Sequence, residues 1–109
     1  MKKTFDEGLY KKIRINDLIL FSIFSVLENK EKCTFERLVK ECFSLFPKSF
    51  NFSKHPKWPD ARKLDRPLRD LRSKRLITGE PKTFFSLTKT GKNLAEETFK
   101  IFRQKKLKI

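Results

Sequence analysis

Residues 60–75 constrain the fold of this chain more than any other stretch. Their apolar side chains recur at helical spacing and form one narrow stripe, made of Ala61, Leu64, Leu68 and Leu71. Arginines and a serine recur at steps of four, three and four along another face, at Arg62, Arg66, Arg69 and Ser73. Such a helix packs on a scaffold through its stripe and presents guanidinium groups outward. Because arginine suits phosphate oxygens and the paired acceptors of guanine, the pattern predicts a nucleic-acid recognition helix.

Alternative interpretations exist for the chemistry and for the shape of this stretch. A basic helix face is often only a solvated surface, and three acids can pair with the arginines: Asp60, Asp65 and Asp70. Pro67 falls past the first turn of a helix that begins at Asp60, where it removes a backbone hydrogen bond. We therefore expect one helix over 60–75 that is kinked at Pro67. The alternative is a short turn over 60–64, followed by a new helix capped by Asp65.

The charge of the chain is large and unevenly distributed. The 109 residues, a length typical of one domain, carry a net charge of +14. Residues 15–53 hold five basic and five acidic side chains, whereas residues 54–75 hold nine basic and three acidic ones. A basic excess of this size favours a polyanionic partner, with nucleic acid first and an anionic membrane second.

Several classes of protein are disfavoured by what the sequence lacks. No apolar run is long enough to span a bilayer or to form the core of a signal peptide, so we expect no membrane partner. Cys33 and Cys42 are too few for a disulfide framework and lack the partners of a zinc site, so we expect a location in the reducing cytoplasm. The sequence has no phosphate-cradling glycine loop and no nucleophile–base pattern. We therefore expect no enzyme, no catalytic residue, no metal and no cofactor.

Two helices are expected before the basic stretch. Asn16 and Asp17 make a good start for a helix that is apolar nearly all round over 18–27, as a central core helix would be. Thr34 is expected to cap a second, amphipathic helix, and Pro47 ends it.

The connection over 48–59 is long for two packed helices. It mixes aromatic and basic residues, namely Phe50, Phe52, His55 and Trp58 with Lys48, Lys54 and Lys57. We expect Phe50, Phe52 and Trp58 to anchor the loop on the core; the alternative is that they stack on bases, as in single-strand binding proteins. His55 is the only histidine and has no partner in the sequence for metal binding or base catalysis. Lys54 and Lys57 are candidate nucleic-acid contacts.

The residues after the basic stretch predict a hairpin and a last helix. Two short β-prone runs flank a Gly-Glu-Pro-Lys turn over 76–87. The order of helix, helix, helix, hairpin and helix resembles a winged helix-turn-helix domain. Residues 68–77 resemble the recognition helix of that family running into its first wing strand. The run Leu87-Thr88-Lys89-Thr90-Gly91 resembles the Leu-Thr-x-x-Gly signature of MarR-like and PadR-like regulators.

Specific roles are expected at the exit from the hairpin. Thr88 is placed to cap the last helix, and Gly91 permits close packing there. In many members of the family a glycine holds the place of Arg75. The long 48–59 connection departs from a simple helix-turn-helix. The wing turn is short, with Lys82 as the basic residue near its tip.

The resemblance covers roughly residues 15–98 and implies a mainly α fold with a small β-hairpin. The chain then divides into three parts. They are an N-terminal extension or short helix over 1–14, the winged helix domain over 15–98, and the end of the last helix with a basic tail over 99–109.

We expect sequence-specific binding of double-stranded DNA, as in a transcriptional regulator, with residues 60–75 in the major groove. Base edges or adjacent phosphates would be contacted by Arg62, Arg66 and Arg69, and Ser73 on the same face is a further nucleic-acid contact. Backbone phosphates would be held mainly by Lys63, Arg72, Lys74 and Lys82. The alternative is a winged-helix adaptor or accessory subunit of a nucleic-acid-processing complex, which binds a protein or single strands.

The resemblance to these regulators also implies a homodimer, with the last helix carrying part of the interface. Phe99 and Phe102 lie beyond what a small three-helix core needs, so we expect them to pack on a partner. The alternative is that they fold back on the other end of the same chain, against Leu9, Tyr10 and Ile13.

Overall fold

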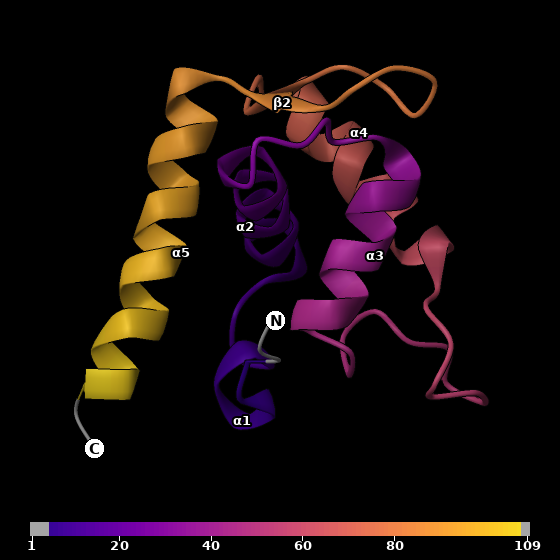
Figure 1. Ribbon diagram of the computed structural model, residues 1–109, viewed down its shortest axis with the longest axis vertical. Coiled ribbons are helices and arrows are strands. Elements are labelled where there is room, and N and C mark those ends of the chain that lie inside the picture. Colours follow the sequence, from indigo (N-terminus) through magenta and orange to yellow (C-terminus); the bar gives the residue numbers. More distant parts are fainter. Residues whose placement is uncertain (1–4, 108–109) are drawn as a thin grey trace.

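In the computed structural model, which describes residues 5–107, the chain is mainly helical with one small antiparallel hairpin (Figure 1). The helices are α1 (Glu7–Tyr10), α2 (Ile15–Glu28), α3 (Phe35–Leu45), the 3-10 helix η1 (Ala61–Leu64), α4 (Asp65–Ser73) and α5 (Lys89–Leu107). The strands are β1 (Ile77–Thr78) and β2 (Ser86–Leu87). The expected mainly α class with a hairpin is confirmed. Of the expected extension and basic tail, residues 1–4 and 108–109 lie outside the described part of the chain. No helix within the described range has both the length and the apolar character to cross a membrane.

Helix α2 lies at the centre of the core, between α5 and α3 (Figure 1). Its buried side chains surround the helix, as its continuous apolar pattern predicts: Leu18, Ile19, Leu20, Phe21, Ser22, Ile23 and Val26. The helix begins at Ile15, so Asp17 lies in its first turn as expected, but the expected side-chain cap is wrong because no side chain caps this helix. Asn16 instead donates a hydrogen bond from Nδ2 to Oδ2 of Asp70 in α4, at 2.8 Å. This side chain therefore joins two helices rather than ending one.

Helix α3 is capped as expected and carries a buried ion pair. Oγ1 of Thr34 accepts a hydrogen bond from the backbone amide of Arg37 at 3.1 Å, and the helix ends before Pro47. On the inner face of α3, the side chain of Glu41 is fully buried. Its carboxylate accepts hydrogen bonds from Nη1 of Arg37 at 2.8 Å and from Oγ of Ser25 at 2.5 Å. The second bond fixes α3 against α2.

Aromatic rings from α5 and from the segment before α1 pack together in the core. Phe102 in α5 is only 4% exposed, and its ring centroid lies 4.3 Å from that of Phe5 and 5.8 Å from that of Phe46. Phe99 is 39% exposed and stacks on Phe21 at 5.9 Å. The prediction that Phe102 packs on a partner molecule is therefore wrong, because this side chain folds back into the core of its own chain.

The hairpin lies across one end of the helices (Figure 1). Ile77 of β1 is opposite Leu87 of β2, and an isolated bridge pairs Phe85 with Cys33 of the segment between α2 and α3. Gly79 has a φ of +95°, and a Cβ at this position would lie 2.0 Å from a carbonyl oxygen of the returning segment. Only glycine fits this turn without moving the backbone.

The chain leaves the hairpin through a tight junction with the end of α4. Oγ1 of Thr88 accepts a hydrogen bond from the amide of Gly91 at 3.1 Å and donates to the carbonyl oxygen of Arg75 at 2.8 Å. A Cβ on Gly91 would lie 1.9 Å from the carbonyl oxygen of Leu76. The expected cap at Thr88 and the expected close packing at Gly91 are both confirmed.

Candidate nucleic-acid interface

The basic stretch forms two consecutive helical segments rather than one kinked helix. Asp60 caps η1, because its Oδ1 accepts a hydrogen bond from the backbone amide of Arg62 at 3.1 Å. Helix α4 begins at Asp65, which is its first residue and not its cap. Pro67 thus falls in the first turn of α4, where a backbone amide has no partner within the helix. The expected kink at Pro67 is therefore wrong, since the proline removes no hydrogen bond at this position.

The apolar stripe of the stretch is buried as its spacing predicts. Its core members are Leu64, Leu68 and Leu71. They seat α4 on α2, and the hydrogen bond between Asn16 and Asp70 fixes the same contact. Because the stripe faces inward, Arg66 and Arg69 are exposed on α4.

Two acids of the stretch, Asp60 and Asp70, are engaged by groups other than these two arginines, and the partner of Asp60 is Arg62. Oδ2 of Asp70 accepts the hydrogen bond from Asn16 and lies 3.2 Å from Nζ of Lys74. Hydrogen bonds from Lys74 and then from Asn16 hold the pKa of Asp70 below its ordinary value. Within residues 5–107, no ion pair joins Arg66 or Arg69 to a carboxylate. Their charge is therefore available to an anionic partner.

A hollow separates α4 from the hairpin. Its volume is about 220 Å³, and it is lined by Asp65, Leu68, Arg69, Arg72, Pro81 and Phe85. Nη1 of Arg72 donates a hydrogen bond to the carbonyl oxygen of Gly79 at 3.2 Å, which ties the exposed side of α4 to the hairpin. Arg72 therefore holds two parts of the interface together, in addition to its predicted role toward phosphate.

Arg62 and Lys63 are separated from the α4 face. Both belong to η1, and a 3-10 helix has three residues per turn, so the four-residue step from Arg62 to Arg66 no longer keeps them in line. Nε of Arg62 lies 3.7 Å from Oδ1 of Asp60, and its guanidinium carbon lies 6.0 Å from the centroid of the Phe52 ring. The structure therefore places Arg62 beside the 47–60 loop, whereas Lys63 is half-buried.

The other predicted contacts lie at the ends of this surface. Ser73 and Lys74 are exposed at the end of α4, and Lys82 is exposed in the hairpin turn. Lys54 and Lys57 are exposed in the 47–60 loop.

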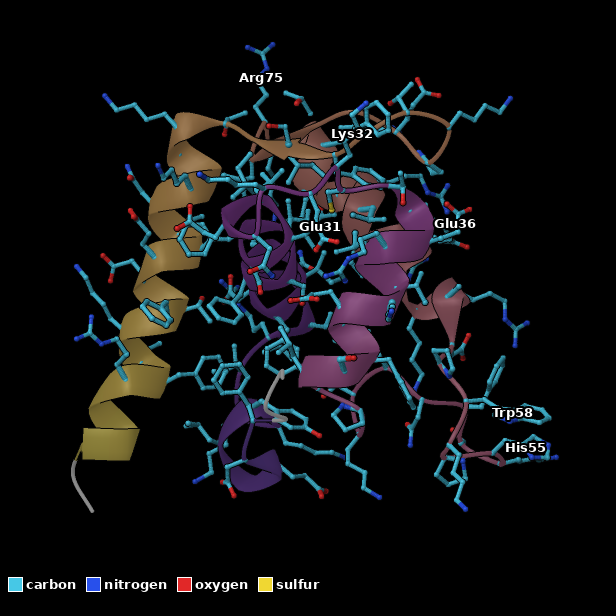
Figure 2. The ribbon with its side chains drawn as sticks, viewed as in Figure 1. Glu31, Lys32, Glu36, His55, Trp58 and Arg75 are labelled. Atoms are coloured by element: carbon cyan, nitrogen blue, oxygen red, sulfur yellow. The ribbon has the colours of Figure 1, made fainter. Side chains whose placement is uncertain are left out.

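Arg75 is a basic residue of this surface that the predicted contacts omitted. It follows α4 with a φ of +58° and projects away from the body of the molecule (Figure 2). The position of Arg75 in the sequence could have identified it: in the family that the chain resembles, a glycine often holds this position, and glycine favours the left-handed backbone conformation.

The 47–60 loop is anchored differently from the prediction. Phe50 is buried in the core and anchors the loop as predicted, whereas Phe52 is only half-buried and lies beside the guanidinium group of Arg62. Trp58 is 57% exposed and is no anchor; its ring stacks on that of His55, with centroids 4.5 Å apart. The loop is therefore anchored at its base by Phe50, whereas the side chain of Trp58 remains exposed.

Comparisons of this chain with protein-family models, with curated proteins and with solved structures find no match. The functional assignment therefore depends on the side chains of α4, the hairpin and the 47–60 loop.

Proposed function

We propose that this chain is a winged-helix protein that binds double-stranded DNA sequence-specifically, as a transcriptional regulator, with α4 in the major groove. The observation that carries the proposal is the outer face of α4. Arg66 and Arg69 are exposed there, and no ion pair joins them to a described carboxylate, while the leucines of the opposite face are buried. Arginine on an exposed helix is the commonest means of reading guanine in the major groove.

The neighbouring elements support the same reading. Arg72 ties the hairpin to the exposed side of α4, so the hairpin would lie beside the bound groove as a wing. Lys82 in the hairpin turn and Lys74 at the end of α4 would then contact backbone phosphates on either side. Such contacts position a protein on the duplex without reading its sequence.

The test compares two double variants that remove the same charge. Arg66→Ala with Arg69→Ala alters the proposed reading face, and Lys11→Ala with Lys12→Ala alters exposed residues directly after α1. Helices α1 and α4 lie toward opposite ends of the molecule (Figure 1), so the second variant is a control for total charge. Affinity is measured for a duplex selected from a random pool and for an unrelated duplex, at several salt concentrations.

We expect only the α4 variant to lose discrimination between the two duplexes. An arginine that binds guanine should contribute about 1–3 kcal/mol at that base. An arginine that binds phosphate should weaken all sequences alike and reduce the salt slope by about one unit. Equal affinities and equal salt slopes for the two double variants would refute the proposal.

A protein partner on α5 is the second candidate, favoured by apolar side chains that remain exposed on that helix. These are Leu94, Phe99 and Ile101. The partner we propose is a second copy of the chain, which would bring two α4 helices to one DNA. Sedimentation at micromolar concentration, with and without the selected duplex, distinguishes a dimer from a monomer. A different protein that co-purifies with the chain, with only weak sequence-indifferent DNA binding, would instead support an adaptor.

A further inference from the structure

An exposed aromatic pair projects from the 47–60 loop. Figure 2 shows Trp58 and His55 lying side by side, directed away from the helices. Their rings are 25° from parallel, and Trp58 is the most exposed of the large apolar side chains in the described part of the chain. An indole ring left open to water forgoes the favourable free energy of burial. Its exposure therefore points to a partner that covers it.

The backbone of the loop holds this pair in a fixed position. The amide of Asp60 donates to the carbonyl oxygen of Phe50 at 2.7 Å, and the amide of Phe52 donates to that of Trp58 at 3.0 Å. The amide of Trp58 in turn donates to the carbonyl oxygen of His55 at 2.9 Å. The loop thus resembles a short hairpin whose base is buried at Phe50. A pair that is already positioned loses little conformational entropy on binding.

The charge around the pair favours a nucleic acid. Residues 51–59 contain Lys54 and Lys57 and no acidic side chain. Arg62 lies at the base of the loop, near the ring of Phe52. Aromatic rings beside lysine and arginine form the surfaces on which single-stranded bases stack while cations hold the backbone.

We propose that Trp58, backed by His55, stacks on an unpaired base next to the duplex that α4 binds. Base faces inside a duplex are covered by their neighbours, so only an unpaired base can offer its face to an indole ring. The loop leads directly into η1 at Asp60, and α4 follows, so Trp58 precedes the proposed reading face by only a few residues of chain. The preferred ligand is then a duplex with a single-stranded overhang. The binding of the duplex by α4 rests on the proposed function, whereas the stacking of Trp58 on an unpaired base does not.

Trp58 is the only tryptophan of the chain, so its fluorescence reports on this site directly. The protein is titrated with a blunt duplex, with the same duplex carrying a short overhang, and with the overhang strand alone. We expect quenching by the overhang and by the single strand, and tighter binding of the overhang duplex than of the blunt one. Trp58→Ala should weaken overhang binding roughly 5- to 150-fold and leave blunt-duplex binding unchanged. Trp58→Phe should retain part of the overhang preference.

The matched control is Phe84→Ala, which removes the other strongly exposed aromatic ring, on the hairpin. This variant should keep the overhang preference. The stacking inference is overturned if Trp58→Ala binds both duplexes with the affinity of the wild type, or if its affinity for both duplexes falls by the same factor. The proposed function would still stand as long as the Arg66 and Arg69 double variant loses discrimination. A protein that binds through Trp58, with nucleic-acid affinity unaffected by Trp58→Ala, would also overturn it and assign the loop to a protein partner.

Discussion

Two helices of this chain end in the same backbone turn, and in both the turn holds a long basic residue in the left-handed conformation. Lys30 after α2 and Arg75 after α4 have φ values of 60° and 58°. In the second turn, the amide of Arg75 donates to the carbonyl oxygen of Arg72, and the amide of Leu76 donates to that of Leu71, each at 3.0 Å. This is the Schellman pattern, in which glycine is the favoured residue. A side chain with a Cβ is less stable there by about 1–2 kcal/mol.

Arg75→Gly should therefore raise the free energy of unfolding. We expect a gain of about 1 kcal/mol, because the relief of the left-handed backbone is partly offset by the greater freedom of glycine in the unfolded chain. The measurement is urea unfolding at fixed pH and salt. Lys30→Gly is the matched control and should gain a similar amount. A gain at both positions would show that the basic residues are not there for stability; a loss at Arg75 would contradict the assigned turn.

At the scale of elements, the spacing of apolar residues and the capping residues predicted the features that depend on neighbouring positions in the sequence. The spacing of leucines predicted the buried face of the basic stretch. Thr34 and Thr88 were predicted to cap helices, and the structure confirms both caps. The failure at Pro67 is local, because the stretch divides into η1 and α4, whereas other failures involve partners distant in the sequence. Asn16 bonds to Asp70, 54 residues away, instead of capping α2. No periodicity reveals such a contact, and none reveals that Phe50 alone anchors the loop and leaves Trp58 exposed.

The packing of α3 on α2 depends on a charge that the same patterns did not reveal. Glu41 is fully buried, and Nη1 of Arg37 supplies its ion pair at 2.8 Å. Arg37→Met should lower the free energy of unfolding by about 3–5 kcal/mol, because it leaves the carboxylate buried without this counter-charge. The combined variant Arg37→Met with Glu41→Leu removes both charges and should recover most of that loss. A double variant as unstable as the single one would show that shape, and not charge, governs this contact.

At the scale of the whole molecule, the chain separates a scaffold from a basic surface. Buried residues of α2, α3, α4 and α5 form the core. The most basic segment is residues 54–75, with nine basic and three acidic side chains on the end of the 47–60 loop, η1, α4 and the turn after it; residues 76–109 add eight basic and three acidic ones. A surface of this kind attracts nucleic acid over a distance set by the ionic strength, about 8 Å at physiological salt. The segment before α1 also packs on this core, since Phe5 stacks on Phe102 of α5.

Phe102→Ala should therefore destabilise the monomer itself. The side chain is 4% exposed and contacts the rings of Phe5 and Phe46, so we expect a loss of about 3–5 kcal/mol in the free energy of unfolding. The matched control is Ile101→Ala, one residue earlier on the same helix and 43% exposed, which should cost less than about 1 kcal/mol. Urea unfolding measures both variants, and sedimentation of each reports any change in assembly. If Phe102 instead packed on a second molecule, its replacement would leave the stability of the monomer unchanged and abolish a dimer. Equal losses for the two variants would likewise contradict the closed core described here, because only one of these neighbouring side chains lies within it.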